Sequence, residues 1–183
     1  MGKNKLSMSK IKGFTLIELL VSMIVLGVMA SFFLMNFPRA QMRSRDVQRK
    51  SDLDKYAAAL ERYANDNEGY YPRVNNAVPA HGQLCSDLGL SDCPSDPRDG
   101  ENSCRGVCRY FYQSDGVSAG PGVPIYISAT AYTLRSRIEE FSTSGVDGSC
   151  PASHSIFWVV CSGGVRGYYC GRDVDFSNGV CPL

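Results

Sequence analysis

Cysteine is the reactive side chain that stands out in this chain of 183 residues, because all eight cysteines follow residue 84. Such a density over roughly 100 residues is typical of a disulfide framework in an oxidising compartment. Eight cysteines allow about 105 pairings, so spacing alone leaves the connectivity open. Closure between sequence neighbours predicts the pairs Cys85–Cys93, Cys104–Cys108, Cys150–Cys161 and Cys170–Cys181.

Other reactive groupings are weaker. Cys108 and His154 match a nucleophile and a base in type, but a free thiolate is not expected among cysteines that are oxidised. No Cys-x-x-Cys pair is present, which disfavours a structural zinc site. The sequence also lacks a phosphate-binding glycine loop and a His-Glu-x-x-His. We therefore expect no enzymatic activity and no cofactor.

One short segment could hold calcium. Asp173, Asp175 and Ser177 offer oxygen ligands on alternate residues, as a calcium-binding loop does. The glycine of this segment, Gly179, comes one place late for an EF-hand loop, and no acidic residue follows to close the site. A solvated turn is the alternative interpretation.

A single carboxylate lies inside a long apolar run. The run extends from Phe14 to Phe37, about 24 residues, which is enough for a helix to cross the bilayer core. Its only charge is Glu18, and a carboxylate in hydrocarbon is costly, so Glu18 is a candidate functional residue with a partner. The preceding residues, 1–13, carry lysines but no acid, which favours a cytoplasmic position. The cysteines favour an extracytoplasmic position for the other end.

The junction between leader and run has a recognisable sequence. From residue 12 to residue 18 the chain reads Lys-Gly-Phe-Thr-Leu-Ile-Glu, which resembles the class III signal of type IV prepilins and type II secretion pseudopilins. This resemblance implies cleavage after Gly13 by a membrane-embedded prepilin peptidase and methylation of the new amino terminus at Phe14. It further implies that Glu18 neutralises the amine of a neighbouring subunit during filament assembly.

The resemblance also implies partners and a location. The partners are copies of this chain and related pilins in a filament, the prepilin peptidase, and a pilus or secretion assembly machinery. The location is a single-pass inner-membrane protein with an extracytoplasmic head, later assembled on the cell surface. Major pilin, minor pilin, and secretion or competence pseudopilin all remain open. An uncleaved, membrane-anchored extracellular binding module is the alternative from another class.

The apolar run continues into an amphipathic helix. Between residues 38 and 68 one face is apolar at helical spacing, formed by Leu53, Tyr56, Ala57, Leu60, Tyr63 and Ala64. Charged residues between positions 46 and 62 are expected on the opposite face, and Gly69 is expected as the left-handed residue that ends the helix. Gly27 and Pro38 are weak points. The resemblance implies melting between them on assembly, and a static kink is the alternative.

Residues 69–183 form the expected head, with loops over 70–104 and one helical turn near Cys85. Strand patterns occur at 107–113, 132–139, 156–161 and 167–170. They predict an antiparallel sheet of three or four strands, with Arg135, Arg137 and Glu139 on its wet face. Packing of the amphipathic helix on this sheet gives an α+β fold with disulfide-bonded loops. Tyrosines beside Arg109, Arg135 and Arg137 raise the hypothesis of a DNA-binding surface.

Overall fold

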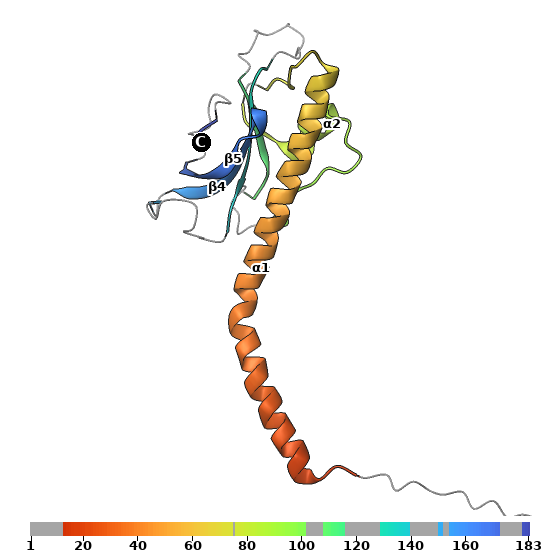
Figure 1. Cartoon of the computed structure of the whole chain (residues 1–183), viewed down its shortest axis with the longest axis vertical. Helices are drawn as coiled ribbons and strands as arrows, with labels where there is room; N and C mark the ends of the chain where they lie inside the picture. Colours follow the sequence, from red (N-terminus) through yellow and green to blue (C-terminus); the bar gives the residue numbers. More distant parts are fainter. Residues whose placement is uncertain are drawn as a thin grey trace, which may run out of the picture. The chain divides into compact units, whose positions relative to one another are not determined.

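The computed structural model describes residues 13–74, 76–101, 108–115, 129–139, 150–151, 154–172 and 181–183, except for the side chains of 33–36. The chain divides into two compact units, Met1–Ala40 and Gln41–Leu183. One helix, α1, occupies Leu16–Asp66 and contributes to both units (Figure 1). The α+β class predicted from the sequence is confirmed.

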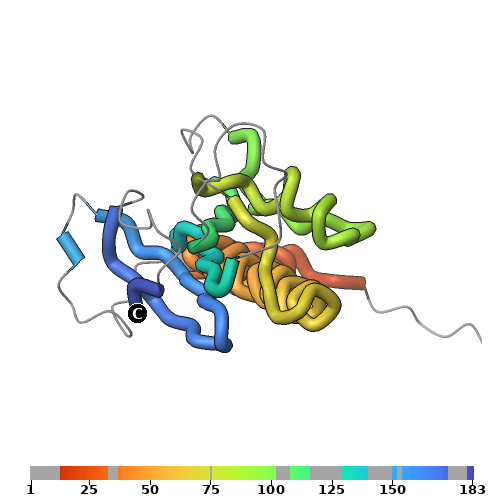
Figure 2. Tube along the Cα trace, turned by 90° about the horizontal axis from the view of Figure 1, so that it is seen from above, coloured from red at the N-terminus to blue at the C-terminus, as the bar shows by residue number. Residues whose placement is uncertain are grey.

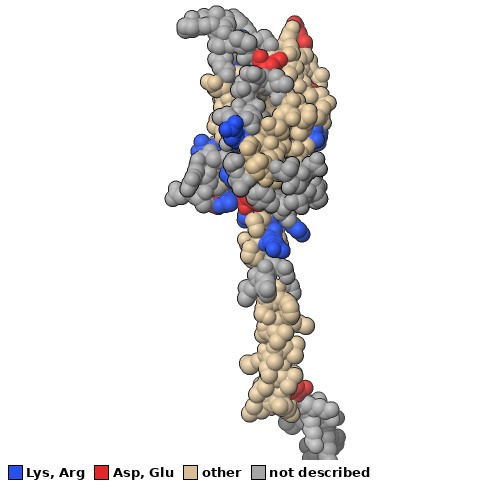
Figure 3. All heavy atoms as spheres, turned by 90° about the vertical axis from the view of Figure 1, so that its left-hand side faces the viewer, with Lys and Arg blue, Asp and Glu red and all other residues tan. Residues whose placement is uncertain are grey.

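The first unit consists of the amino-terminal part of α1 with its apolar side chains uncovered. Phe14 is 80 % exposed and Leu16 is 82 % exposed. In Figure 3 the helix below its grey segment is mostly uncharged, with acidic atoms near its lower end. Among the described residues, no single helix meets the length and hydropathy of a membrane span, and Leu16–Phe32 and Phe37–Asp66 meet them only when taken together. The helix is assigned without a break at Gly27 or Pro38, so melting on assembly stays a prediction.

The carboxyl end of α1 differs in detail from the prediction. Glu68, not Gly69, is the first residue with a left-handed backbone, with φ of 58°. The Gly69 amide then donates to the Ala64 carbonyl at 2.8 Å, as in a Schellman motif whose C″ residue is Gly69. A Cβ in this conformation crowds the following carbonyl, so Glu68 holds a position that glycine would occupy with less strain.

The second unit contains a five-stranded antiparallel sheet, one strand more than the upper prediction. Its order is β1-β2-β3-β4-β5, with antiparallel pairing throughout. The strands are β1 Val78–Pro79, β2 Phe111–Ser114, β3 Tyr132–Arg137, β4 Ser155–Cys161 and β5 Arg166–Gly171. Strand β1 was not predicted because two residues, one of them proline, carry no alternating pattern.

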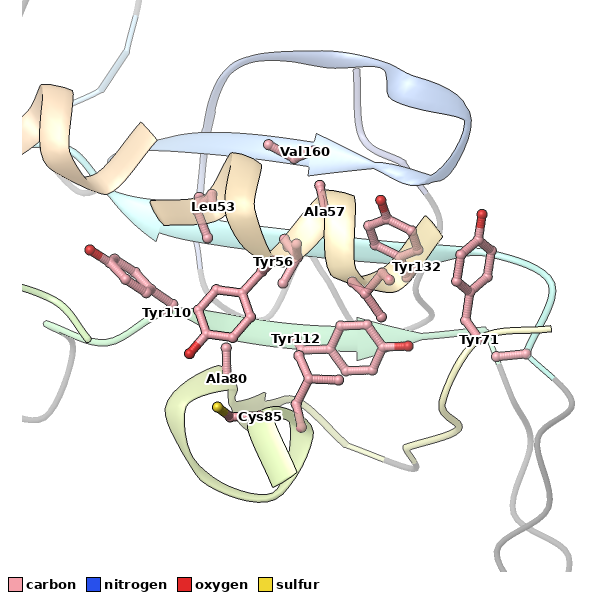
Figure 4. Packing of buried hydrophobic residues seen from close by; sticks show 14 of the residues in the cluster. Leu53, Tyr56, Ala57, Tyr71, Ala80, Cys85, Tyr110, Tyr112, Tyr132 and Val160 are labelled. Atoms are coloured by element: carbon pink, nitrogen blue, oxygen red, sulfur yellow. The ribbon is translucent and has the colours of Figure 1, made fainter. Parts of the chain in front are cut away.

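The head half of α1 packs on this sheet through the predicted apolar face. Leu53, Tyr56 and Leu60 are fully buried there, in one cluster with Tyr112 and Tyr132 of the sheet (Figure 4). Figures 1 and 2 show β4 and β5 to one side of α1 and α2 (Cys85–Asp87) to the other. The predicted helical turn near Cys85 is therefore confirmed, and a π-helical segment, η1 at Ala80–Leu84, precedes it.

The disulfides are partly those predicted. Cys85–Cys93 is confirmed, with a Cα–Cα distance of 5.8 Å. The structure pairs Cys150 with Cys170 and Cys161 with Cys181, so the predicted pairs Cys150–Cys161 and Cys170–Cys181 are wrong. Cys104, of the predicted Cys104–Cys108 pair, lies outside the described residues, and Cys108 is disulfide-bonded.

The register of β4 and β5 explains the correction. Cys150 precedes β4 and Cys161 ends it, so a strand of roughly 20 Å, at about 3.3 Å per residue, separates them. Strand β5 runs back antiparallel and places Cys170 opposite Ile156, at the start of β4. Cys170 therefore meets Cys150, and Cys161 is left for Cys181.

Candidate functional site

The candidate cleavage site lies just before the first helical turn. Gly13 and Phe14 are exposed and precede α1, which begins at Leu16. An exposed, non-helical peptide bond is the kind of site that a peptidase can engage. A Cβ added at Gly13 would meet no atom within 4 Å, so the fold of the chain places no demand on glycine at this position.

Glu18 has a partner within its own helix. The Thr15 amide and hydroxyl both donate to Glu18 Oε2 at 3.4 Å, and the Glu18 amide donates to Thr15 Oγ1 at 3.3 Å. This reciprocal arrangement is a capping box, which satisfies amide donors that the first turn leaves without intrahelical acceptors. Sequence reasoning missed the role of Thr15, although Thr-x-x-Glu before an apolar run is the signature of such a cap.

The apolar surface continues beyond the cap. An open groove in the first unit is lined by Thr15, Ile17, Glu18, Val21, Ser22, Val25 and Leu26. Most of these residues are apolar and exposed, and contiguous exposed apolar side chains mark a contact with a membrane or another protein. Glu18 is thus a charged group beside an apolar surface that would be stabilised by burial against a membrane or another protein.

A second charged site lies in the other unit, where the sequence predicted a solvated helix face. Asp46, Arg49 and Asp52 were expected in water, but they are 5 %, 1 % and 3 % exposed. The error arises because their partners are far away in the sequence. Asp52 accepts a hydrogen bond from the Tyr110 hydroxyl at 3.0 Å, and the other two residues join a larger cluster.

Arg49 is the centre of that cluster. Its Nε and Nη2 donate to the two carboxylate oxygens of Asp96 at 2.7 and 2.9 Å. Its Nη1 donates to Asp46 at 2.7 Å, and Nη2 also contacts Glu139. Burial alone would lower the pKa of Arg49, but hydrogen bonding and charge from Asp96, together with Glu139 and Asp46, raise it above the ordinary value.

Glu139 closes the cluster from the far end of β3. It was predicted on a wet face, yet its side chain is 14 % exposed and binds both Arg45 and Arg49. Burial would raise the pKa of Glu139, but hydrogen bonds from the two arginines outweigh burial and lower it to about 2. The cluster therefore fixes Glu139 as an anion at neutral pH.

The other predicted sites are the calcium segment, the Cys108 nucleophile and the arginine surface. Asp173, Asp175 and Ser177 lie outside the described residues, and no group of metal-ligating side chains occurs within the described ones. The disulfide at Cys108 removes the thiolate that a nucleophile would need. Arg135 is 4 % exposed, and it lies over the Phe111 ring at 5.3 Å.

The tyrosines that suggested a DNA-binding surface are buried. Tyr110, Tyr112 and Tyr132 are at most 1 % exposed, so their rings cannot stack on bases. Arg109 is engaged by Asp99 at 3.0 Å. The three tyrosines and Arg135 are buried, whereas Arg137 is exposed, so DNA binding stays a hypothesis without these aromatic residues.

Comparison with known proteins gives one match. Residues 8–34 match the model of the prokaryotic N-terminal methylation motif. Neither the curated proteins nor the solved structures gave a match to the chain. The matched range contains the junction of Gly13 with Phe14, the capping box and most of the exposed apolar run. The amino terminus of this chain therefore carries the class III signal of type IV pilins and type II secretion pseudopilins.

Proposed function

We propose that this chain is the precursor of a structural subunit in a type IV pilus-like filament. Prepilin peptidase cleaves it after Gly13 and methylates the new amino terminus at Phe14. The observation that supports this proposal is the position of the methylation motif, which coincides with an exposed apolar helix that holds a single carboxylate. A type II secretion or competence pseudopilin would be cleaved and methylated in the same way and would differ in the filament that it joins.

The apolar surface gives the energetic reason for assembly. Burial of apolar surface is favourable by about 25 cal/mol per Å², so exposed side chains such as Phe14 and Leu16 require a cover. The membrane provides it before assembly, and the helices of other copies provide it afterwards. Because both environments are apolar, a buried charge pair is the contact that distinguishes correct stacking from a slipped register.

Glu18 supplies one member of that pair in the proposal, and the methylated amine at Phe14 of a neighbouring copy supplies the other. Within one chain the Glu18 carboxylate accepts from Thr15. Assembly would require this carboxylate to accept a charged amine as well, and its two oxygens have the capacity for both. The proposal thus gives Glu18 two roles, helix cap and intersubunit partner.

Two substitutions separate the roles. Glu18→Gln keeps a side chain that can form a capping box but removes the charge, whereas Thr15→Val removes the cap hydroxyl and keeps the charge. We expect Glu18→Gln to insert in the membrane and to be cleaved, but to yield no filaments. Thr15→Val is expected to assemble. Normal filaments from Glu18→Gln would refute the charge-pair role.

The alternative from another class is an anchored extracellular module that keeps its leader. Substitution of Gly13 by a bulky residue distinguishes it. Because a Cβ at Gly13 would meet no atom within 4 Å, we expect a loss of filaments in Gly13→Leu to reflect processing rather than folding. If wild type and Gly13→Leu both retain the leader in the membrane fraction and neither yields filaments, the anchored module is favoured.

A further inference from the structure

The contacts between α1 and the sheet change character along the helix. From Leu53 onward the buried helix residues are mainly apolar: Leu53, Tyr56, Ala57, Leu60 and Ala64. Between residues 41 and 52 the buried ones are Asp46, Arg49 and Asp52, and all three are charged. In this stretch the apolar Val47 is 66 % exposed. Two kinds of contact therefore hold one helix to one head.

The charged stretch contacts the head at several places. Arg45 and Arg49 bind Glu139, which follows β3, and Arg49 also binds Asp96, which follows the Cys85–Cys93 loop. Lys50 lies over two rings, with Nζ 4.7 Å from the Trp158 ring centre and 4.6 Å from that of Tyr168. Its ammonium also donates to the Tyr168 hydroxyl.

None of these contacts belongs to the hydrogen-bond ladder of the sheet. Glu139 and Asp96 lie outside the strands, and Trp158 and Tyr168 face each other across β4 and β5 and contribute only their side chains. Separation of residues 45–50 from the head would break no backbone hydrogen bond of the sheet. The intrahelical hydrogen bonds of α1 would persist as well.

The energetics of separation also differ between the two stretches. Opening an apolar contact exposes hydrocarbon to water, and no new favourable interaction offsets this cost. Opening a buried ion cluster returns its charges to water, and the recovered hydration offsets much of the lost attraction. The cluster around Arg49 joins cations and anions that would all regain water. Its separation is therefore less costly than its number of hydrogen bonds implies.

Trp158 provides an independent observation. Its indole Nε1 is buried and has no hydrogen-bond partner among the described residues. A buried donor without an acceptor is unfavourable, and contact with water would satisfy it. Lys50 Nζ lies over the ring of this tryptophan, and the tryptophan side chain also packs against the apolar cluster that contains Leu53.

We propose that residues 45–50 of α1 form a charge-held latch, which opens from the sheet as a unit while the apolar contacts from Leu53 onward stay closed. The latch allows the proximal turns of the head-bound helix to detach without unfolding of the head. Partial opening of this kind occurs where the contacts of a structure are least stable. The proposal does not depend on the filament assignment.

Trp158 makes the latch measurable because it is the single tryptophan of the chain. The full chain in detergent micelles is titrated with urea, and two signals are followed. Acrylamide quenching of Trp158 fluorescence reports opening of the latch, and far-UV circular dichroism reports unfolding. We expect Trp158 to become accessible at lower urea than the loss of dichroism. Coincident transitions would overturn the proposal, because helix and sheet would then separate only as one cooperative unit.

A variant that does not touch Trp158 sharpens the test. Glu139→Gln weakens the partner of Arg45 and Arg49, at a distance from the indole in sequence and contacts. We expect it to raise the open population roughly tenfold, the factor for about 1.4 kcal/mol, and so to increase quenching without urea. A lowered unfolding midpoint with unchanged quenching would contradict the latch, and so would no change in either signal.

Two control variants complete the design. Asp54→Asn makes the same carboxylate-to-amide change in an exposed ion pair, that with Arg166, and should alter neither signal. Leu60→Ala removes a fully buried apolar side chain and should lower the unfolding midpoint while leaving Trp158 quenching unchanged in the absence of urea. If Leu60→Ala also increased quenching, the two stretches would not be separable and the proposal would fail.

Discussion

Acid should weaken the head through Glu139 in a way that can be calculated. The pKa of Glu139 is lowered from 4.5 to about 2 in the folded protein, a difference of about 2.5 units. At about 1.36 kcal/mol per unit, the ionised group contributes roughly 3 kcal/mol at neutral pH. Because the side chain is 14 % exposed, solvent screening reduces this value only in part.

The sign follows from the direction of the shift. A depressed pKa in the folded state gives stability that is fully present above pH 4.5 and is lost as pH falls through about 2. Between pH 7 and pH 3 the two-state linkage relation gives a loss of about 2 kcal/mol from Glu139 alone. The remaining stability from this group is lost below pH 3.

The assay compares wild type with Glu139→Gln in detergent micelles. The free energy of unfolding is measured by denaturant titration at pH 7 and at pH 3. Wild type should lose about 2 kcal/mol more than Glu139→Gln over this interval, since glutamine does not titrate. Asp54→Asn, with its exposed ion pair, should follow wild type. Parallel pH profiles for wild type and Glu139→Gln would refute the assignment of Glu139 to the buried cluster.

Three further predictions concern the head. Glu68→Gly should raise the free energy of unfolding by about 1 kcal/mol in denaturant titrations, because glycine adopts the left-handed backbone without a Cβ clash; a loss of stability would contradict the cap geometry. Leu60→Ala should lower it by about 2–5 kcal/mol, as deletion of a fully buried side chain does; a change within error would place Leu60 outside the core. Peptide mapping without reduction should recover Cys150 linked to Cys170; recovery of Cys150 linked to Cys161 would refute the sheet register.

The sequence predicted those parts of the fold that depend on neighbours along the chain. The face from Leu53 to Ala64 follows from helical spacing, and β3 and β4 follow from alternating or continuous apolar residues. The Thr15–Glu18 cap was equally readable, because both residues lie within one turn. The correct predictions thus concern residues whose partners are close in the chain.

It failed where the partner is remote. Arg49 is buried against Asp96 and Glu139, which lie 47 and 90 residues away in the sequence. No local pattern encodes those contacts. The pairing of Cys150 with Cys170 likewise follows from the antiparallel return of β5, which closure between neighbours ignores. Charged residues on an amphipathic helix are usually exposed, so Arg49 in particular gave no signal that it would be buried.

The most direct test of the filament assignment is mass spectrometry of filaments sheared from the cell surface, read at the amino-terminal peptide of this chain. The account predicts a peptide that begins at methylated Phe14 in the sheared fraction, which would establish processing and assembly together. A chain that retains its leader and occurs only in the membrane fraction would contradict the account and favour an anchored binding module.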